Sequence, residues 1–278
     1  MTLPVRLLAI DIDGTLLDSR FQVPKANLEA LHRAHALGVE VVLTTGRRHD
    51  FALPIAESLG FDLWLISSNG AVTKSFTGQL FHRDLLPAAV ARRLIRDMGE
   101  YRPNTVLTFD REGQGALVIE CADELNASIA RWMEKNAQFL QQVVPLEEAV
   151  TEDPVQVMFC GSIERMKAAE ARIAAGDCFS ETTVLKTQYE VRNLCILDVL
   201  NRDCSKGHAL KRWAEWRGYS REEVMAIGDN YNDVEMLAFA GLPFIMGNAC
   251  PELKMNGWPE TLGNDQGGVA AALQQVGI

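Results

Sequence analysis

Long apolar segments are missing from this 278-residue sequence. No run approaches the roughly 20 apolar residues that a membrane-spanning helix needs. The first residues, Met-Thr-Leu-Pro-Val-Arg, also lack the apolar stretch and cleavage site of a secretory signal peptide. We therefore expect a cytoplasmic protein that has no membrane partner.

Paired cysteines are missing as well. The six cysteines are scattered and form no C-x-x-C pair: they are Cys121, Cys160, Cys178, Cys195, Cys204 and Cys250. Disulfide frameworks and zinc sites both depend on grouped or regularly spaced cysteines. We expect these residues to be small, buried thiols in a reducing compartment.

The sequence also lacks an excess of positively charged residues. The net charge is −10 at pH 7 and the isoelectric point is about 5.1. An acidic surface repels nucleic acid, so no nucleic-acid partner is expected. A site for an anionic substrate would need local cations or a metal ion. With 47% hydrophobic residues, the chain can bury a large core.

The first part of the chain alternates predicted strands and helices. Residues 5–10 form a short apolar run of the type that is buried on both faces of a parallel sheet. Residues 24–37 have helical spacing and stop at Gly38. Two further apolar runs, 39–43 and 63–66, flank a second predicted helix. This order predicts right-handed βαβ crossovers and a parallel sheet.

The middle of the chain follows a different pattern, in which hairpins alternate with helices. The predicted strands lie within 71–82, 105–120, 155–160 and 184–200, and the predicted helices are 122–138 and 164–175. Such a pattern is typical of an antiparallel sheet covered by helices, an α+β module. After Ser205 the first rhythm returns.

The predicted fold class is therefore α/β. A doubly wound, Rossmann-like parallel-sheet core would be made of residues 1–84 and 187–278, with an α+β cap domain at 85–186 inserted into it.

Polar residues follow the predicted core strands. They are Asp11-Ile12-Asp13-Gly14-Thr15, Thr44-Thr45-Gly46-Arg47, Asn69-Gly70 and Gly228-Asp229-Asn230-Tyr231-Asn232-Asp233. Ligands bind at the carboxyl ends of strands in open parallel sheets, so these segments should converge. Lys206 begins a helix of the same core.

Four carboxylates at one sheet edge would repel one another. Asp11, Asp13, Asp229 and Asp233 cannot all stay ionised when buried unless a cation compensates them. Oxygen ligands favour Mg²⁺, which also binds substrate phosphate. The sequence therefore predicts a magnesium site inside an acidic protein.

The positions of these residues suggest roles in phosphoryl transfer. Asp11, at the strand end, is the candidate nucleophile that forms an aspartyl-phosphate. Asp13 can protonate the leaving oxygen and then deprotonate water. Thr45 and Gly46 can donate hydrogen bonds to the phosphate, and Lys206 can offset its charge.

These segments resemble the four motifs of the haloacid dehalogenase superfamily of phosphatases. Asp11 to Asp18 resembles the first motif, Leu43 to Arg47 the second, Ser205-Lys206-Gly207 the third and Gly228 to Asp233 the fourth. The chain is most similar to the Cof-type subfamily, which inserts a cap between the second and third motifs. Ser68-Asn69-Gly70-Ala71 also resembles a segment of that subfamily.

The resemblance implies a role for each matching residue. Asp11, the backbone carbonyl of Asp13, and Asp229 would bind Mg²⁺. The phosphate contacts would be Ile12 N–H, Thr45, Gly46, Lys206 and Asn232. Asp233 would support the site from behind. Strand register alone does not decide whether Thr44 or Thr45 contacts the phosphate, and the resemblance favours Thr45.

The implied activity is that of a hydrolase, a phosphoric monoester phosphatase that acts on a small phosphorylated metabolite, often a sugar phosphate. Two alternatives share the same core motifs. A phosphomutase would return the phosphoryl group to its substrate, and a binding protein would hold a phosphorylated metabolite without turnover. The inserted module would decide the substrate.

Overall fold

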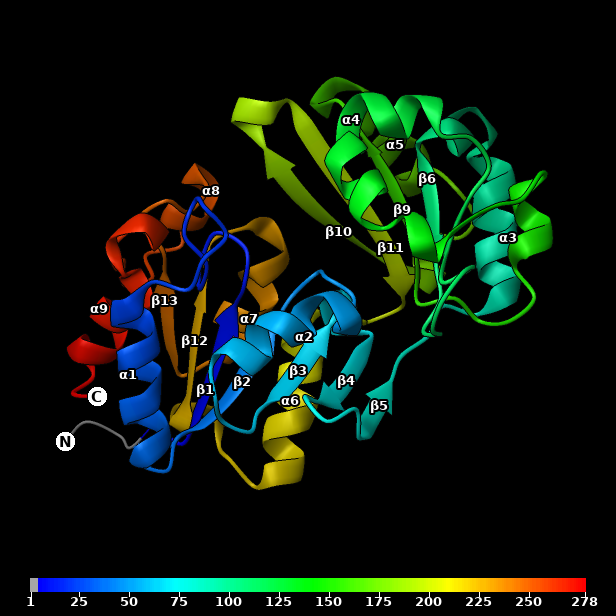
Figure 1. Ribbon diagram of the computed structural model, residues 1–278. Helices are drawn as coiled ribbons and strands as arrows, with labels where there is room; N and C mark the ends of the chain where they lie inside the picture. The colour runs from blue at the N-terminus through cyan, green and yellow to red at the C-terminus, as the bar shows by residue number, and fades with distance from the viewer. Residues whose placement is uncertain (1–4) are drawn as a thin grey trace. The chain divides into compact units, whose positions relative to one another are not determined.

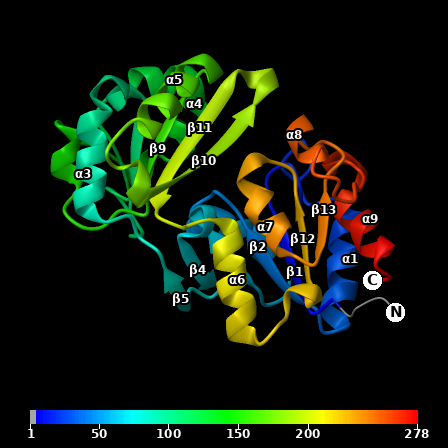
Figure 2. The same cartoon turned by 180° about the vertical axis from the view of Figure 1, so that it is seen from behind.

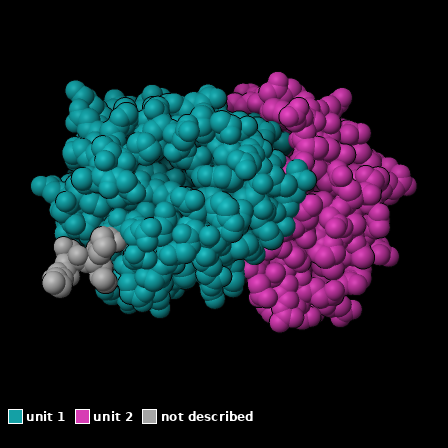
Figure 3. Space-filling view, turned by 90° about the horizontal axis from the view of Figure 1, so that it is seen from below, with its two compact units in different colours: residues 1–83, 205–278 teal, residues 84–204 magenta. Residues whose placement is uncertain are grey.

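The computed structural model describes residues 5–278, which form two compact units (Figure 3). Unit 1 comprises residues 5–83 and 205–278, and unit 2 is Asp84–Cys204. Each unit has its own sheet and its own buried apolar clusters. No helix in the described residues is both long and apolar enough to cross a bilayer.

Within the described residues, unit 1 is built on a seven-stranded sheet with the order β13-β12-β1-β2-β3-β4-β5. Its strands are β1 (Leu7–Asp11), β2 (Glu40–Thr44), β3 (Trp64–Ser67), β4 (Val72–Ser75), β5 (Leu80–Arg83), β12 (Val224–Gly228) and β13 (Leu242–Ile245). The strands from β13 to β3 are parallel, and β4 and β5 are added antiparallel.

Helices cover both faces of this sheet (Figures 1 and 2). They are α1 (Lys25–Ala36), α2 (His49–Ser58), α6 (Lys206–Arg217), α7 (Val234–Phe239), α8 (Pro251–Lys254) and α9 (Gly268–Gln275). Alternate side chains of strand β1 point to opposite faces of the sheet. Leu8 and Ile10 join the apolar cluster under α1, α2 and α9. Leu7 and Ala9 join the opposite cluster under α6 and α7. The core is therefore doubly wound.

Unit 2 contains a six-stranded sheet in the described chain, with the order β10-β11-β9-β6-β7-β8. Its strands are β6 (Thr105–Thr108), β7 (Leu117–Ile119), β8 (Leu140–Gln142), β9 (Gln156–Gly161), β10 (Thr182–Tyr189) and β11 (Leu194–Asn201). The helices are α3 (Ala88–Asp97), α4 (Asp123–Lys135) and α5 (Ile163–Ala174). Helices α3 and α5 share one apolar cluster and α4 lies in another, so the sheet is covered on both faces.

The predicted fold class is confirmed: a doubly wound parallel-sheet core carries an inserted α+β unit. One predicted boundary differs from the structure. Unit 2 ends at Cys204, whereas the sequence placed the end of the cap at residue 186. That position falls inside β10, which pairs with β11 along its whole length, and β11 pairs with β9. Residues 187–204 therefore belong to unit 2, and the second core segment begins at Ser205.

Candidate active site

Four adjacent parallel strands bring the predicted motifs together. Strands β12, β1, β2 and β3 are neighbours in this order and end at Gly228, Asp11, Thr44 and Ser67. Asp11 lies opposite Thr44 in the strand register. Figure 1 shows β12, β1 and β2 side by side in the core. Because these strands are parallel, their carboxyl ends share one edge of the sheet, as the sequence predicted.

Lys206 is a buried cation at this edge. Its side chain is fully buried, and its Nζ donates to Asp11 Oδ1 at 2.6 Å and to Asp233 Oδ1 at 2.7 Å. Burial by itself would lower the pKa of the ammonium group, but the two carboxylates outweigh burial and raise the pKa of Lys206. Lys206 is therefore charged at neutral pH and joins the third motif to the first and the fourth.

The first and fourth motifs also touch directly through Asp229. The Thr15 hydroxyl donates to Asp229 Oδ1 at 3.0 Å. Gly14 has a φ of +85°, and a Cβ at this position would lie 2.4 Å from Asp229 Oδ2. Any side chain at position 14 would therefore push Asp229 away, which explains the glycine between Asp13 and Thr15.

The buried carboxylates form a cluster that can hold a metal ion. Oxygen atoms of Asp11, Asp229 and Asp233 lie within 4.8 Å of one another. Burial, reinforced by the charge of Asp233, raises the pKa of Asp11 to about 7. Burial and the charges of Asp11 and Asp233 also raise the pKa of Asp229 well above its usual range. One lysine does not offset three carboxylates, and a hard divalent cation would, so the residues present fit a metal of this type.

Asp233 already has donors at both of its oxygens. Oδ1 accepts from Lys206, and Oδ2 accepts from the backbone N–H groups of Asp229 and Asn230, each at 3.0 Å. A Cβ on Gly228 would come within 2.7 Å of the Asp233 side chain, so the strand end needs glycine to admit it. This geometry suits a residue that supports the loop and Lys206 from behind.

The two threonines of the second motif have different surroundings. Thr44 is buried, and its hydroxyl donates to the sulfur of Met236 on α7 at 3.2 Å. Thr45 follows the strand end, and its Oγ1 accepts from the Arg47 backbone N–H at 3.0 Å. The Thr44 hydroxyl is therefore engaged by a helix that packs on the sheet, while the Thr45 hydroxyl lies within the loop.

Asp13 forms a two-pronged ion pair with Arg47. Nε of Arg47 donates to Oδ2 at 2.7 Å and Nη2 donates to Oδ1 at 2.5 Å. Both side chains are partly exposed, in contrast to the buried Asp11. The sequence singled out Asp13 but did not predict this partner.

The remaining predicted phosphate contacts lie around the same edge. The Asn232 amide is buried and donates to Asn69 Oδ1 at 2.9 Å. Gly46 packs against this asparagine, because a Cβ on Gly46 would lie 3.2 Å from Asn69 Oδ1. Ile12 stands between the two aspartates in the sequence of the first motif, and its side chain is buried in the apolar core. Sequence reasoning assigned no role to Asn69, although an Asn-Gly pair directly after a strand could have indicated one.

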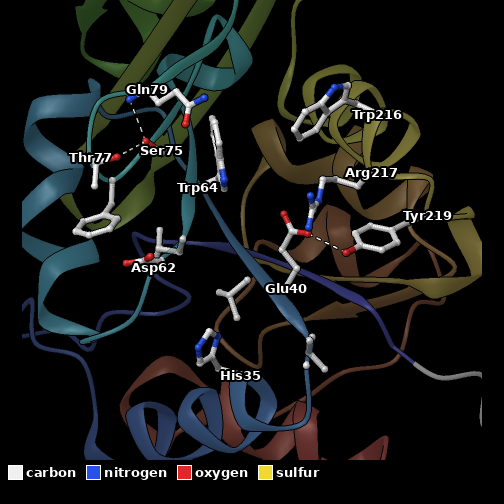
Figure 4. Close-up of a pocket in the computed structure, with 15 residues that line it drawn as sticks. His35, Glu40, Asp62, Trp64, Ser75, Thr77, Gln79, Trp216, Arg217 and Tyr219 are labelled. Carbon is white, nitrogen blue, oxygen red and sulfur yellow. Dashed lines mark hydrogen bonds and ion pairs between the residues drawn. The ribbon is translucent and has the colours of Figure 1, made fainter.

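A cavity of about 510 Å³ lies elsewhere in unit 1 (Figure 4). Its lining includes Glu40 and Trp64, which begin β2 and β3, so it opens at the amino ends of these strands. Glu40 accepts hydrogen bonds there from Arg217 and Tyr219 (Figure 4). None of the residues at the four strand ends lines this cavity, so it is separate from the candidate active site.

Comparison with known proteins places the chain in a family. Residues 8–273 match the model of the haloacid dehalogenase-like hydrolases, and the chain belongs to this family. It is 29% identical to phosphatase YwpJ of Bacillus subtilis (strain 168) over 294 residues, which cover 98% of this chain and 100% of the relative. It is 30% identical to the HMP-PP phosphatase of Escherichia coli (strain K12 / DH10B) over 255 residues, covering 90% of this chain and 86% of the relative.

Solved structures agree with this assignment. A haloacid dehalogenase-like hydrolase from B. subtilis matches with a TM-score of 0.80 and 29% identity, covering 97% of this chain and 99% of that one. A sugar phosphatase of subclass IIB of the superfamily matches with a TM-score of 0.80, covering 98% of this chain and 99% of that one, and its 20% identity supports the fold alone. The predicted enzyme class, a phosphoric monoester hydrolase of the haloacid dehalogenase type, is confirmed by these relatives.

Proposed function

We propose that this phosphatase hydrolyses a small phosphorylated metabolite, with a sugar phosphate as the substrate class, in a Mg²⁺-dependent reaction. The phosphoryl group is transferred first to Asp11 and then to water. One observation carries the proposal. Asp11 ends β1 at 2.6 Å from the buried ammonium group of Lys206, inside a carboxylate cluster whose negative charge requires a cation.

The proposed metal ligands are Asp11, Asp229 and the backbone carbonyl of Asp13. Asp11 and Asp229 are buried oxygen donors with raised pKa values, which a bound cation would lower. Bound Mg²⁺ would neutralise charge on the carboxylates and on the substrate phosphate. Asp233 supports the site without binding the metal, because its oxygens accept from Lys206 and from two backbone N–H groups.

The chain's own residues then carry the two half-reactions. An oxygen of Asp11 forms a bond to phosphorus while the bond to the ester oxygen breaks, and Asp13 gives its proton to that leaving oxygen. In the second half, Asp13 takes a proton from water as the water oxygen attacks phosphorus. Phosphate leaves and the Asp11 carboxylate is restored.

Five groups contact the phosphate in this proposal. They are Ile12 N–H, the Thr45 hydroxyl, Gly46 N–H, the Lys206 ammonium group and the Asn232 amide. Lys206 is the cation among them, and its fixed position between two carboxylates means that it needs little rearrangement when charge develops on the phosphoryl oxygens.

The substrate class follows from the family rather than from the site geometry. HMP-PP phosphatases are relatives of this chain by sequence, and a sugar phosphatase shares its fold. Both names describe hydrolysis of small phosphorylated compounds. The Cof-type resemblance of the four motifs favours sugar phosphates within that class.

A substrate panel tests this proposal. The purified protein should release inorganic phosphate from one or more sugar phosphates in the presence of Mg²⁺, and EDTA should abolish the release until Mg²⁺ is restored. Isomeric sugar phosphates as products would instead indicate a phosphomutase. Binding of a sugar phosphate without turnover would indicate a binding protein, and either result would overturn the proposal.

Asp11→Asn tests the proposed covalent step. The amide keeps the size of the side chain but cannot form the acyl-phosphate, so phosphate release should fall to background while the protein stays folded by circular dichroism. Residual turnover within about tenfold of the wild type would refute a covalent role for Asp11, since nucleophile removal costs orders of magnitude in rate.

A further inference from the structure

The turn that follows β3 has an unusual backbone. Ser68, Asn69 and Gly70 have φ values of +48°, +54° and +106°. Left-handed conformations are unfavourable for residues other than glycine, although asparagine tolerates them better than most. Asn69 is also fully buried. Consecutive left-handed residues of this kind persist only where their surroundings fix them, and they concentrate at functional sites.

The turn holds the loop of the second motif through its backbone. Asn69 N–H donates to the carbonyl of Thr45 at 2.9 Å, and Ser68 N–H donates to the carbonyl of Arg47 at 2.8 Å. These two hydrogen bonds flank Gly46 on either side. The left-handed turn therefore fixes the backbone that carries two of the proposed phosphate contacts.

The same turn reaches the loops of the third and fourth motifs. A Cβ on Gly70 would lie 2.2 Å from the carbonyl oxygen of Ser205, so the turn packs directly against the residue before Lys206. On the other side, the Asn69 Oδ1 atom accepts from Asn232 Nδ2 at 2.9 Å, and both side chains are buried. One short turn thus contacts three loops that are far apart in the sequence.

We propose that Asn69 is a positioning residue for the phosphate pocket. Its Oδ1 atom holds the Asn232 amide in one orientation. Its backbone N–H, placed by the left-handed turn, holds the carbonyl of Thr45 and so fixes the backbone of Thr45 and Gly46. Without Oδ1, the buried Asn232 amide would lose its hydrogen-bond partner and its fixed direction. This inference rests on the proposed function, because Asn232, Thr45 and Gly46 are the phosphate contacts proposed there.

Two substitutions separate the side chain of Asn69 from its backbone. Asn69→Gly keeps the left-handed turn accessible but removes Oδ1, whereas Asn69→Ala removes Oδ1 and strains the turn. Affinity is measured by isothermal titration of inorganic phosphate into the Mg²⁺-loaded protein, which requires no turnover. Asn69→Gly should weaken phosphate binding by about tenfold, the effect of losing one buried hydrogen-bond partner. Asn69→Ala should weaken it at least as much and should also lower the melting temperature.

A double-mutant cycle with Asn232 shows whether Asn69 acts through that residue. Asn232→Ala should weaken phosphate binding, and adding Asn69→Gly to it should change the affinity by no more than about twofold. The half-saturating Mg²⁺ concentration should stay the same in Asn69→Gly, because the turn does not contact Asp11 or Asp229 through any of these bonds.

Asn104→Ala in unit 2 is the matched control. Asn104 is also fully buried and uses both ends of its amide, donating to the Cys160 carbonyl and accepting from Arg165. This variant should melt at a lower temperature and bind phosphate like the wild type.

Wild-type phosphate affinity in Asn69→Gly, or a full additional loss on top of Asn232→Ala, would overturn the positioning role. Failure of the proposed function has a different signature, which is a lack of Mg²⁺-dependent turnover on the substrate panel while phosphate binding persists. No phosphate binding by the wild-type protein would contradict the proposed pocket itself.

Discussion

At the scale of single residues, the candidate site is governed by unbalanced charge. Three buried carboxylates form a cluster, and one buried ammonium group, that of Lys206, contacts two of them. The pKa of Asp11 rises to about 7 from its ordinary value of 3.8, chiefly because the carboxyl is buried. Without a metal, the Asp11 carboxyl therefore keeps its proton up to about pH 7, which reduces the negative charge of the cluster. Protons and metal ions compete for the same oxygens at such a site.

This competition predicts how the stability of the metal-free protein depends on pH. Between about pH 4 and pH 7 the folded state keeps a proton on Asp11 that the unfolded chain has already released. The folded state binds more protons in this range, so its stability falls as the pH rises. The raised pKa of Asp229 acts in the same direction.

Thermal unfolding in EDTA at pH 5, 6 and 7 measures this effect, with Asp11→Asn as the comparison. The melting temperature of the wild type should fall more steeply with rising pH than that of the variant. Adding Mg²⁺ at pH 7 should raise the melting temperature of the wild type again. Equal pH dependence in the two proteins would show that Asp11 does not titrate in this range.

The ion pair between Asp13 and Arg47 leads to a second prediction at this scale. Arg47→Met leaves Asp13 without the guanidinium group that fixes both of its oxygens. Proton transfer to the leaving oxygen should then be less efficient. General acid catalysis contributes roughly 10² to 10⁴ in rate, and we expect kcat on alkyl phosphates to fall by about tenfold to a hundredfold.

The choice of substrate distinguishes this role from substrate binding. A 4-nitrophenyl leaving group departs without a proton, so Arg47→Met should retain most of its activity on 4-nitrophenyl phosphate. Arg47→Lys keeps the charge but loses the two-pronged geometry and serves as the matched variant. Equal losses on alkyl and aryl phosphates would mean that Arg47 binds substrate and does not orient Asp13.

At the scale of elements, the contact between α6 and α7 positions Lys206 relative to Asp233. Helix α6 begins at Lys206, and Ser205 caps it by accepting a hydrogen bond from the His208 N–H at 3.2 Å. The Ser205 hydroxyl also hydrogen-bonds to Glu235 on α7. Gly207 lies at the contact, since a Cβ there would be 2.5 Å from the Glu235 backbone carbonyl carbon.

Gly207→Ala should therefore destabilise the protein, although replacing glycine by alanine within a helix is usually stabilising. Alanine gains about 1 kcal/mol over glycine in a helix, but overpacking against backbone costs about 1–3 kcal/mol or more. We expect a net loss of stability in urea unfolding, together with reduced kcat because Lys206 shifts. Gly99→Ala, where a Cβ would meet nothing within 4 Å, should leave both values unchanged. A Gly207→Ala protein as stable as the wild type would contradict this account of the contact.

The core elements could be predicted from the sequence because short apolar runs ended in polar motifs. The helix α3 was not predicted, although its buried residues Val90, Ala91, Leu94 and Ile95 have helical spacing. Strand β8 spans only Leu140–Gln142, which is too short for a period to be recognised.

For the candidate site, the sequence predicted which loops converge but not how their side chains pair. Strand ends indicate which loops converge, so the positions of Asp11, Lys206 and Asp229 followed from the pattern and the resemblance. The pairs Asp13–Arg47 and Asn69–Asn232 could not be predicted in this way, because each depends on the direction of two side chains across separate loops.

At the scale of the whole molecule, the boundary of the inserted unit follows from sheet topology. Strand β11 lies between β10 and β9, so the chain leaves unit 2 only after this inner strand is complete. The sequence pattern gives this apolar run as a strand of the α+β pattern, yet the predicted boundary at residue 186 placed it in the core. Its side chains Cys195, Leu197 and Val199 belong to the main apolar cluster of unit 2.

This topology predicts which fragment of the chain can fold alone. Residues 84–204 contain a complete sheet with helices on both faces, and a unit of this size with its own core can fold independently. The expressed fragment 84–204 should show a single cooperative thermal transition by circular dichroism. Residues 85–186, the boundaries expected from sequence, lack β11 and would leave part of β10 with no strand beside it. That shorter fragment should unfold without a cooperative transition or aggregate, and matching melting curves for the two fragments would show that β11 is dispensable.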